Sequence, residues 1–190
     1  MADPASPLVP AAAPSVGPRE RFVVQLHDAT TLHADLRLQV GDVLRSWAVP
    51  KGPSLDPSVR RLAVPVPDHD LASGDFEGVH EGQLRGTGAV IIWDEGTVRI
   101  TRDEPDHLSF VLAGRRLSGR FGLTRTGPRR WVLVKADDAA ARRGSDVMAD
   151  DPASVRTGRT WQQVAAASNS AGPDSAGPDS AGPDSAGPNR

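Results

Sequence analysis

The sequence predicts a mainly β protein: a small antiparallel β-barrel with one or two short helices and disordered termini. Several short segments alternate apolar and polar residues with a period of two, as half-buried strands do. Gly, Asp and Pro residues at turn-forming positions separate these segments, and few stretches show a helical period. Seven or eight short strands at such spacing are typical of a barrel or a sandwich, and we expect the barrel.

The two ends of the chain differ from the middle in composition. Residues 1–18 are rich in Pro and Ala, and the segment 168–190 carries a repeat of Ser-Ala-Gly-Pro-Asp. Neither end has enough apolar side chains to offset the entropy lost on ordering, so we expect both to be disordered. This leaves residues 19–167 as one domain with one core, since about 150 residues suit a single domain.

The strands are expected in order along this domain. The first covers residues 22–27, and residues 32–49 form a hairpin that turns at Gly41-Asp42. Asp94-Glu95-Gly96 is predicted to connect two strands of a later hairpin. We expect minor helices at Asp137–Arg143 and Thr160–Ala167, with Thr160 as a candidate N-cap. The remaining expected strands are Leu62–Val66, Gly88–Trp93, Thr97–Thr101, Leu108–Ala113, Leu117–Leu123 and Trp131–Lys135.

Composition excludes several classes of function. The net charge of −2 rules out a uniformly basic surface for coating nucleic acid, so any phosphate contact must come from a local cluster. Because the chain has no Cys, it has no disulfides, thiolate metal sites or thiol nucleophiles. There is no basic and apolar leader and no run of about 18 apolar residues, so we expect a cytoplasmic protein without membrane association.

One strand carries a candidate metal site. Alternation over residues 32–39 projects His33, Asp35 and Arg37 to one face, while the opposite face is aliphatic. His27 ends the preceding strand and can reach the same patch. Two imidazoles and a carboxylate suit a divalent cation, with Mn²⁺ or Fe²⁺ more natural than Zn²⁺ because the carboxylate is a hard ligand.

Cationic residues near this patch indicate what such a metal would act on. Arg37 shares the strand face, Lys51 lies in a loop bounded by Pro and Gly, and Arg61 opens the next strand. Cations around a metal fit a phosphate ester, since the metal polarises one oxygen and the cations neutralise charge on the others.

These residues stand in a longer pattern that closely resembles the 3′-phosphoesterase domain of bacterial DNA ligase D. The resemblance spans roughly residues 22–164. It is carried by Gln25-Leu-His27-Asp-Ala-Thr-Thr-Leu-His33-Ala-Asp35-Leu-Arg37, Ser46-Trp-Ala-Val-Pro-Lys51-Gly-Pro, Asp68-His69, Asp75-Phe-Glu-Gly78, Trp93-Asp-Glu-Gly-Thr97, Trp131-Val-Leu-Val-Lys135 and Ser154-Val-Arg-Thr-Gly-Arg-Thr160.

The resemblance implies a small β-barrel that holds Mn²⁺, or another divalent metal, and processes DNA 3′ ends in repair and end joining. It implies removal of a 3′-ribonucleoside as a diesterase and of a 3′-phosphate as a monoesterase. The partners it implies are DNA or DNA/RNA 3′ ends at primer–template junctions, with a separate ligase, polymerase or end-joining factor. We expect a monomer in the cytoplasm, associated with the nucleoid.

Site residues follow from the resemblance position by position. His27, His33 and Asp35 match the metal ligands, and Gln25 matches a supporting polar residue. The residues that match the catalytic and phosphate-binding groups are Arg37, Lys51, Arg61 and His69.

Two other functions remain open from the sequence. Pro67 replaces an acidic residue of the family, Ser73 replaces a Tyr, and the family's charged residues before the first strand have no counterpart. These differences favour a catalytically weakened module that binds DNA 3′ ends. The second alternative is an iron oxygenase with a 2-His-1-carboxylate triad formed by His33, Asp35 and His69. The Arg and Lys residues around the patch argue for phosphate instead.

Overall fold

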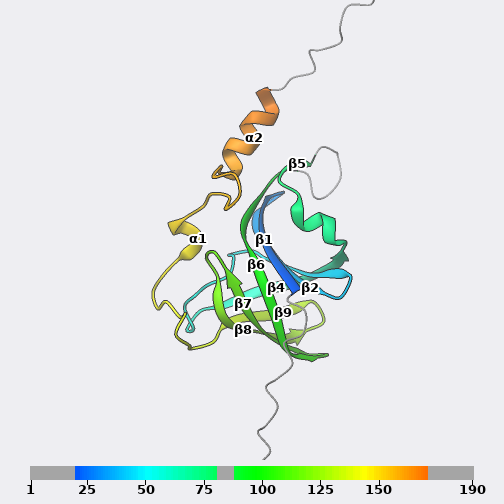
Figure 1. Cartoon of the computed structure of the whole chain (residues 1–190), viewed down its shortest axis with the longest axis vertical. Helices are drawn as coiled ribbons and strands as arrows, with labels where there is room; N and C mark the ends of the chain where they lie inside the picture. Colours follow the sequence, from blue (N-terminus) through cyan, green and yellow to red (C-terminus); the bar gives the residue numbers. More distant parts are fainter. Residues whose placement is uncertain (1–19, 81–87, 171–190) are drawn as a thin grey trace, which may run out of the picture.

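The computed structural model describes residues 20–80 and 88–170, and these form a closed antiparallel β-barrel (Figure 1). The expected disordered segments, 1–18 and 168–190, lie outside the described residues except for 168–170. The barrel confirms the predicted fold class. Its strands are β1 (Glu20–Asp28), β2 (Leu32–Val40), β3 (Val43–Val49), β4 (Arg60–His69), β5 (Gly78–His80), β6 (Gly88–Glu104), β7 (His107–Gly114), β8 (Ser118–Gly127) and β9 (Arg130–Lys135).

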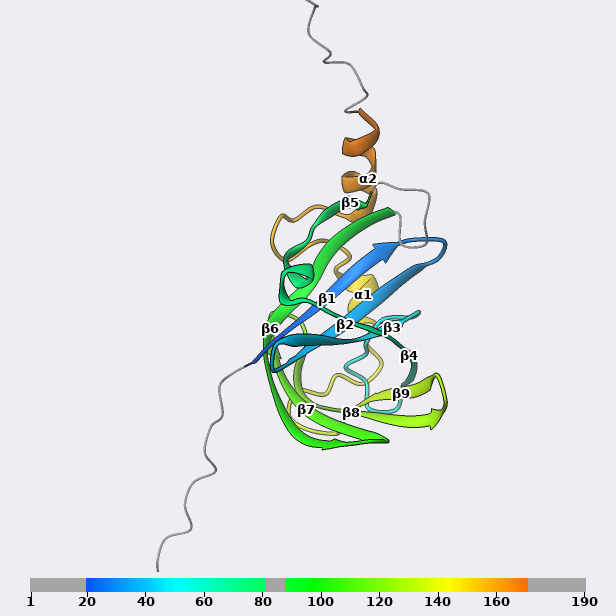
Figure 2. The same cartoon turned by 90° about the vertical axis from the view of Figure 1, so that its right-hand side faces the viewer.

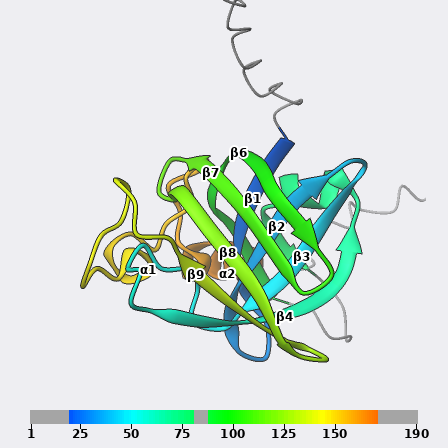
Figure 3. The same ribbon diagram turned by 90° about the horizontal axis from the view of Figure 1, so that it is seen from below.

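The strands follow the order β1-β2-β3-β4-β9-β8-β7-β6, and β1 pairs with β6 to close the barrel. Strand β6 is long enough to serve two neighbours. Its first half pairs with β1 and its second half with β7, while short β5 adds to its start. Figures 2 and 3 show the strands wrapping around one interior. Closure leaves few strand edges unpaired, which removes the usual route to aggregation of β proteins.

Alternation along each strand fills that interior. Phe22, Leu36, Trp93 and Phe110 are at most 1% exposed and belong to one continuous hydrophobic cluster. On β2 the inward residues are aliphatic, whereas the outward ones are polar, as the sequence predicts. The apolar half of the strand therefore fixes the register, and the polar half is held in place by it.

Strand β6 corrects one prediction. Asp94-Glu95-Gly96 was expected to be a hairpin turn, but β6 runs without interruption through these residues. Asp94 is fully buried and accepts backbone hydrogen bonds from Arg115, Arg116 and Leu117, so it caps the turn between β7 and β8. The strand bends at a register shift against β1 instead of reversing.

A second correction concerns Asp137–Arg143, which was expected to be a helix and is a series of turns. The carboxylate of Asp138 accepts hydrogen bonds from the backbone of Arg120 and Ala140 and from Lys135 Nζ. These contacts hold the backbone in a turn, because they satisfy its polar groups without a helical ladder.

The helices are short. After a 3₁₀ helix η1 (Leu71–Asp75), the chain forms α1 (Val147–Asp150) and α2 (Trp161–Ser170). The expected helix at Thr160–Ala167 is confirmed as α2, which extends away from the barrel (Figure 1). Thr160 and Gln163 exchange side-chain to backbone hydrogen bonds at its start, which is a capping box. Within the described part of the chain, no helix has the length and apolar character needed to cross a membrane.

Candidate metal and phosphate site

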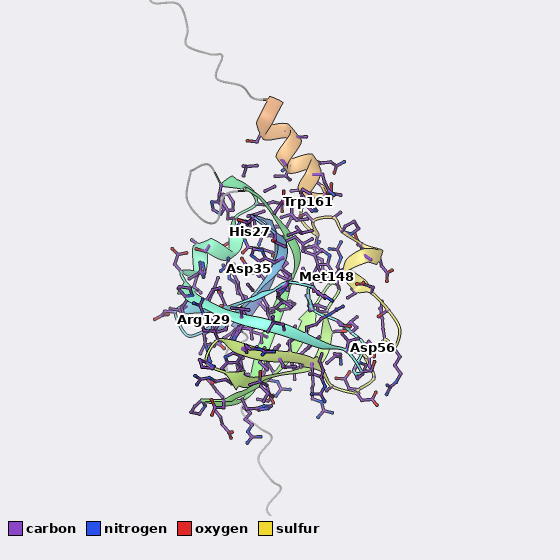
Figure 4. The ribbon with its side chains drawn as sticks, turned by 180° about the vertical axis from the view of Figure 1, so that it is seen from behind. His27, Asp35, Asp56, Arg129, Met148 and Trp161 are labelled. Atoms are coloured by element: carbon purple, nitrogen blue, oxygen red, sulfur yellow. The ribbon has the colours of Figure 1, made fainter. Side chains whose placement is uncertain are left out.

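His27, His33 and Asp35 form a cluster on the outer face of β1 and β2. The two histidines are directly paired across the strands, and Asp35 lies two residues further along β2. One ligand atom from each residue lies within 4.8 Å of the other two. His33 Nε2 is 3.4 Å from Asp35 Oδ1, and His27 Nδ1 is 4.0 Å from Asp35 Oδ2. Figure 4 shows His27 and Asp35 on the same part of the barrel.

The orientation of His33 suits a metal ligand. Its Nδ1 lies 2.8 Å from the carbonyl oxygen of Thr31. A carbonyl can only accept, so Nδ1 carries a hydrogen; Nε2 donates to Asp35 when the imidazole is protonated and offers a lone pair on that side when it is neutral. A backbone carbonyl that fixes the tautomer of a histidine in this way is common behind metal-ligating imidazoles.

The electrostatics keep Asp35 ionised. Burial raises the pKa of its carboxyl, but the hydrogen bond from His33 and the charge of Arg37 outweigh burial and leave this pKa below its ordinary value. The same hydrogen bond raises the pKa of His33, against the effect of burial. The cluster thus offers an ionised carboxylate and two imidazoles, a donor set that fits a divalent cation of intermediate hardness.

Arg37 is buried beside the cluster and uses its three nitrogens separately. Nη2 donates to Asp35 Oδ2 at 2.9 Å, Nε to Gln25 Oε1 at 2.7 Å, and Nη1 to Ser46 Oγ at 3.2 Å. Burial lowers the pKa of the guanidinium and Asp35 raises it, but arginine stays charged in any case. Three hydrogen bonds thus fix the orientation of the guanidinium, and one of them joins it directly to the candidate metal ligand Asp35.

The other predicted site residues surround this centre at different distances. His69 pairs with Leu44 at the start of β3 and is half-buried; burial and then the charge of Arg37 lower its pKa. Lys51 is exposed in the turn that follows β3, beyond Val49, which pairs with Ala34. Both therefore lie on the β3 side of the cluster.

Arg61 is the exception. Asp35, Ala48 and Val64 occupy one row across β2, β3 and β4, so their side chains share a face. Arg61 lies three residues before Val64, and the pleat directs it to the opposite face, with Ala63 of the core. Its Nε is buried without a hydrogen-bond partner among the described residues.

Gln25 is a connection between the cluster and the segment after β4. Its amide Nε2 donates to the carbonyl oxygens of Ser73, at 3.1 Å, and Phe76, at 2.9 Å, while its Oε1 accepts from Arg37. The hydroxyl of Ser73 is itself bonded to Asp70 at 2.7 Å, where it helps to cap η1. Ser73 therefore contributes its carbonyl rather than its hydroxyl to the site.

Sequence reasoning missed His80. Its ring stacks on Phe76 with centroids 4.1 Å apart and lies 6.2 Å from the ring of His27. It reaches the cluster because β5 pairs with β6, which in turn pairs with β1. The sequence holds no local signal for this proximity.

Comparison with known proteins identifies similar sequences. The family model described as "DNA Ligase D 3′-phosphoesterase domain" matches residues 25–125, a range that contains all eight predicted site residues. The chain is 49% identical over 151 residues to the multifunctional non-homologous end joining protein LigD of Pseudomonas aeruginosa, covering 74% of this chain and 18% of that protein.

Two mycobacterial relatives extend the comparison. A LigD protein of Mycobacterium tuberculosis is 42% identical over 129 residues, which are 65% of this chain and 17% of the relative. That of Mycolicibacterium smegmatis is 33% identical over 150 residues, 73% of this chain and 20% of the relative. The chain thus spans about a fifth of the length of the curated relatives that it matches.

Proposed function

Since the chain belongs to the DNA ligase D 3′-phosphoesterase domain family, we propose that it is a Mn²⁺-dependent phosphoesterase acting on DNA 3′ ends. The observation that carries the proposal is the position of Asp35, which lies between two imidazoles on one side and the Arg37 guanidinium on the other. We propose that Asp35 both binds the divalent cation and orients the guanidinium of Arg37 that binds phosphate.

In this proposal His27, His33 and Asp35 hold the metal. A bound divalent cation would polarise a phosphoryl oxygen and stabilise the charge that develops on it. Mn²⁺ is proposed because the two nitrogen donors and one carboxylate oxygen suit it. Other divalent metals are to be tested in its place in the assay.

Arg37 binds the phosphoryl group that is transferred. Its side chain is 10% exposed and its three hydrogen bonds are already formed, so little reorganisation is needed when substrate binds. His69, whose imidazole is close enough to Arg37 and Asp35 to respond to their charges, supplies an N–H, and Lys51 supplies an exposed charge. Arg61 would have to reach around the strand edge, so its role is the least supported of these by geometry.

The substrates we propose are 3′-terminal ribonucleosides and 3′-phosphates at primer–template junctions. We propose that the protein processes them during end joining in the cytoplasm, in association with the nucleoid. A separate ligase and polymerase would complete such repair. The alternative of a binding module that has lost turnover is favoured by one contact: the hydroxyl of Ser73, which replaces the family's Tyr, is occupied by Asp70. The oxygenase alternative took a later histidine such as His69 as its second imidazole, whereas the cluster holds His27; the Arg37 guanidinium bonded to Asp35 favours a phosphate substrate over an oxygenase.

The test is a primer–template whose primer ends in one ribonucleotide, incubated with the protein and Mn²⁺. We expect loss of the terminal nucleoside and then of the phosphate, and no reaction by His33→Ala. His107→Ala is the matched control, because its imidazole bonds to Thr124 and Ser109 away from the cluster. Absence of product at any wild-type concentration, or equal product from His33→Ala, would overturn the proposal. Salt-sensitive binding of 3′-phosphate ends without product would support the binding module instead.

A further inference from the structure

The segment 70–77, which contains η1, lies against the outer face of β1 beside the cluster. It has no strand pairing of its own, and two of its backbone carbonyls accept the amide of Gln25. Gln25 Oε1 also accepts a hydrogen bond from Arg37 Nε. The segment therefore orients the amide of Gln25, and the amide in turn orients Arg37. Whatever holds this segment therefore acts on the candidate phosphate site.

Two carboxylates hold the end of the segment. Asp75 receives Arg21 Nη1, at 3.0 and 3.1 Å, and Arg156 Nη2 at 3.0 Å. Glu77 receives the hydroxyls of Ser154 and Thr157. Three of these four partners, Arg156, Ser154 and Thr157, come from one loop that follows α1.

This loop is itself fixed to the barrel. Val155 N donates to the carbonyl oxygen of Ile92 on β6 at 2.9 Å, and Ser154 Oγ accepts the backbone N–H groups of Arg156 and Thr157. Arg156 also forms a bidentate pair with Glu95 of β6, with Nε 3.0 Å from both oxygens and Nη2 2.6 Å from Oε2. The guanidinium thus joins β6 to Asp75 through a fixed geometry.

We propose that Arg156 is a positioning residue for the phosphate site, acting through Asp75, segment 70–77 and Gln25 on Arg37. This rests on the proposed function, because it assigns the relay to the guanidinium that would bind phosphate. The relay ends at Arg37. Asp35 accepts from Arg37, but like His27 and His33 it is placed by the pairing of β1 with β2, so we expect the metal ligands to keep their positions.

Magnitudes separate this role from a purely stabilising one. The side chain of Arg156 is 34% exposed and that of Asp75 51%, and exposed ion pairs contribute about 0–1 kcal/mol to folding. A misplacement of about 1 Å in a catalytic contact, by contrast, can reduce the rate about 100-fold. Loss of Arg156 is therefore expected to lower activity far more than stability.

The experiment compares Arg156→Gln and Arg156→Lys with the wild type in full-length protein. We expect Arg156→Gln to reduce kcat/KM about tenfold with unchanged Mn²⁺ affinity. Arg156→Lys should recover only part of this, since a lysine cannot pair with two carboxylates in fork geometry. Arg102→Gln is the matched control, because it removes an exposed arginine paired with Glu104 at the far end of β6.

A second readout does not depend on turnover. The Nε–H of Arg37 is buried and bonded to Gln25, so its NMR signal should exchange slowly in the wild type and several-fold faster in Arg156→Gln. In the double variant Gln25→Ala/Arg156→Gln, activity should be no lower than in Gln25→Ala alone. Arg156 is proposed to act on Arg37 through Gln25, so its loss has no further effect once Gln25 is removed.

The outcomes are distinct. Additive losses in the double variant, or an Arg37 signal in Arg156→Gln that exchanges as in the wild type, would overturn the relay. A wild type without phosphoesterase activity would overturn the proposed function, yet faster exchange at Arg37 in Arg156→Gln would still support the relay.

Discussion

His27 and His33 are directly opposed residues of the antiparallel pair β1–β2, and their ring centroids lie 5.1 Å apart. The pairing of two strands therefore brings the imidazoles together without any loop. A shift of one residue in this register would turn one histidine to the interior, where the aliphatic residues now lie. The hydrophobic face of β2 thus determines the geometry of the candidate metal site.

Metal binding is expected to stabilise the protein through this pair. With Mn²⁺ at 100 times its Kd, binding contributes about 2.7 kcal/mol, equal to roughly 5–10 °C in Tm for a domain of this size. His33→Ala should lose this increase, and EDTA should reverse it in the wild type. Thermal melts with and without Mn²⁺ measure both. An increase in Tm that survives in His33→Ala would show that Mn²⁺ binds elsewhere.

Arg37→Lys tests the phosphate site separately from the metal. Arg37 donates to Asp35, Gln25 and Ser46 from three separate nitrogens, which the single ammonium of a lysine cannot do. The substitution therefore keeps the positive charge but loses the planar donor geometry. We expect kcat to fall about 100-fold while the Mn²⁺-dependent rise in Tm persists. Arg45→Lys is the control, since Arg45 pairs with the exposed Asp103. Wild-type kcat in Arg37→Lys would contradict the role proposed for this guanidinium.

The proximity of the residues in the candidate metal site could be predicted from sequence because strand alternation is local. His33, Asp35 and Arg37 follow each other at every second position, and the aliphatic residues between them mark the buried face. The same reasoning could not find His80, whose approach to His27 depends on the order of strands across the sheet. It also could not find the segment bound to Gln25, about 50 residues further along the chain.

The error at Asp94 has the same origin. Asp-Glu-Gly between two apolar runs is a normal turn signal, and sequence alone holds no information on the backbone N–H groups that surround Asp94. Gly96 is required here for a different reason: a Cβ would lie 2.1 Å from the carbonyl oxygen of Ala113 on β7. The glycine marks close approach of two strands rather than a reversal of the chain.

Asp94→Ala is accordingly expected to be strongly destabilising. It would leave three backbone donors without their acceptor, of which that of Leu117 is buried, at a cost of about 3 kcal/mol. Urea unfolding of Asp94→Ala and of Asp103→Ala provides the comparison, because Asp103 pairs with Arg45 at the surface and its loss should cost less than about 1 kcal/mol. Equal unfolding midpoints for the two variants would refute a capping role.

The pair Lys135–Asp138 predicts how stability depends on acid. Lys135 Nζ lies 2.5 Å from Asp138 Oδ1, and its side chain is fully buried. Burial raises the pKa of Asp138, but the hydrogen bonds from Lys135 and from the backbone of Arg120 and Ala140 outweigh it and lower the pKa from 3.8 to about 2. The ionised form is therefore favoured by the fold.

Because the pKa in the folded state is the lower one, the stabilisation is complete above pH 3.8 and is lost as the pH falls towards 2. The shift corresponds to about 2 kcal/mol. Urea unfolding between pH 2 and 6 should thus show a wild-type advantage over Asp138→Asn that shrinks in this window. Asp137→Asn is the matched control, since Asp137 is exposed and pairs only with Arg143 among the described residues. A difference between wild type and Asp138→Asn that stays constant from pH 6 to pH 2 would contradict the shifted carboxylate, because a neutral asparagine cannot lose stability by taking up a proton.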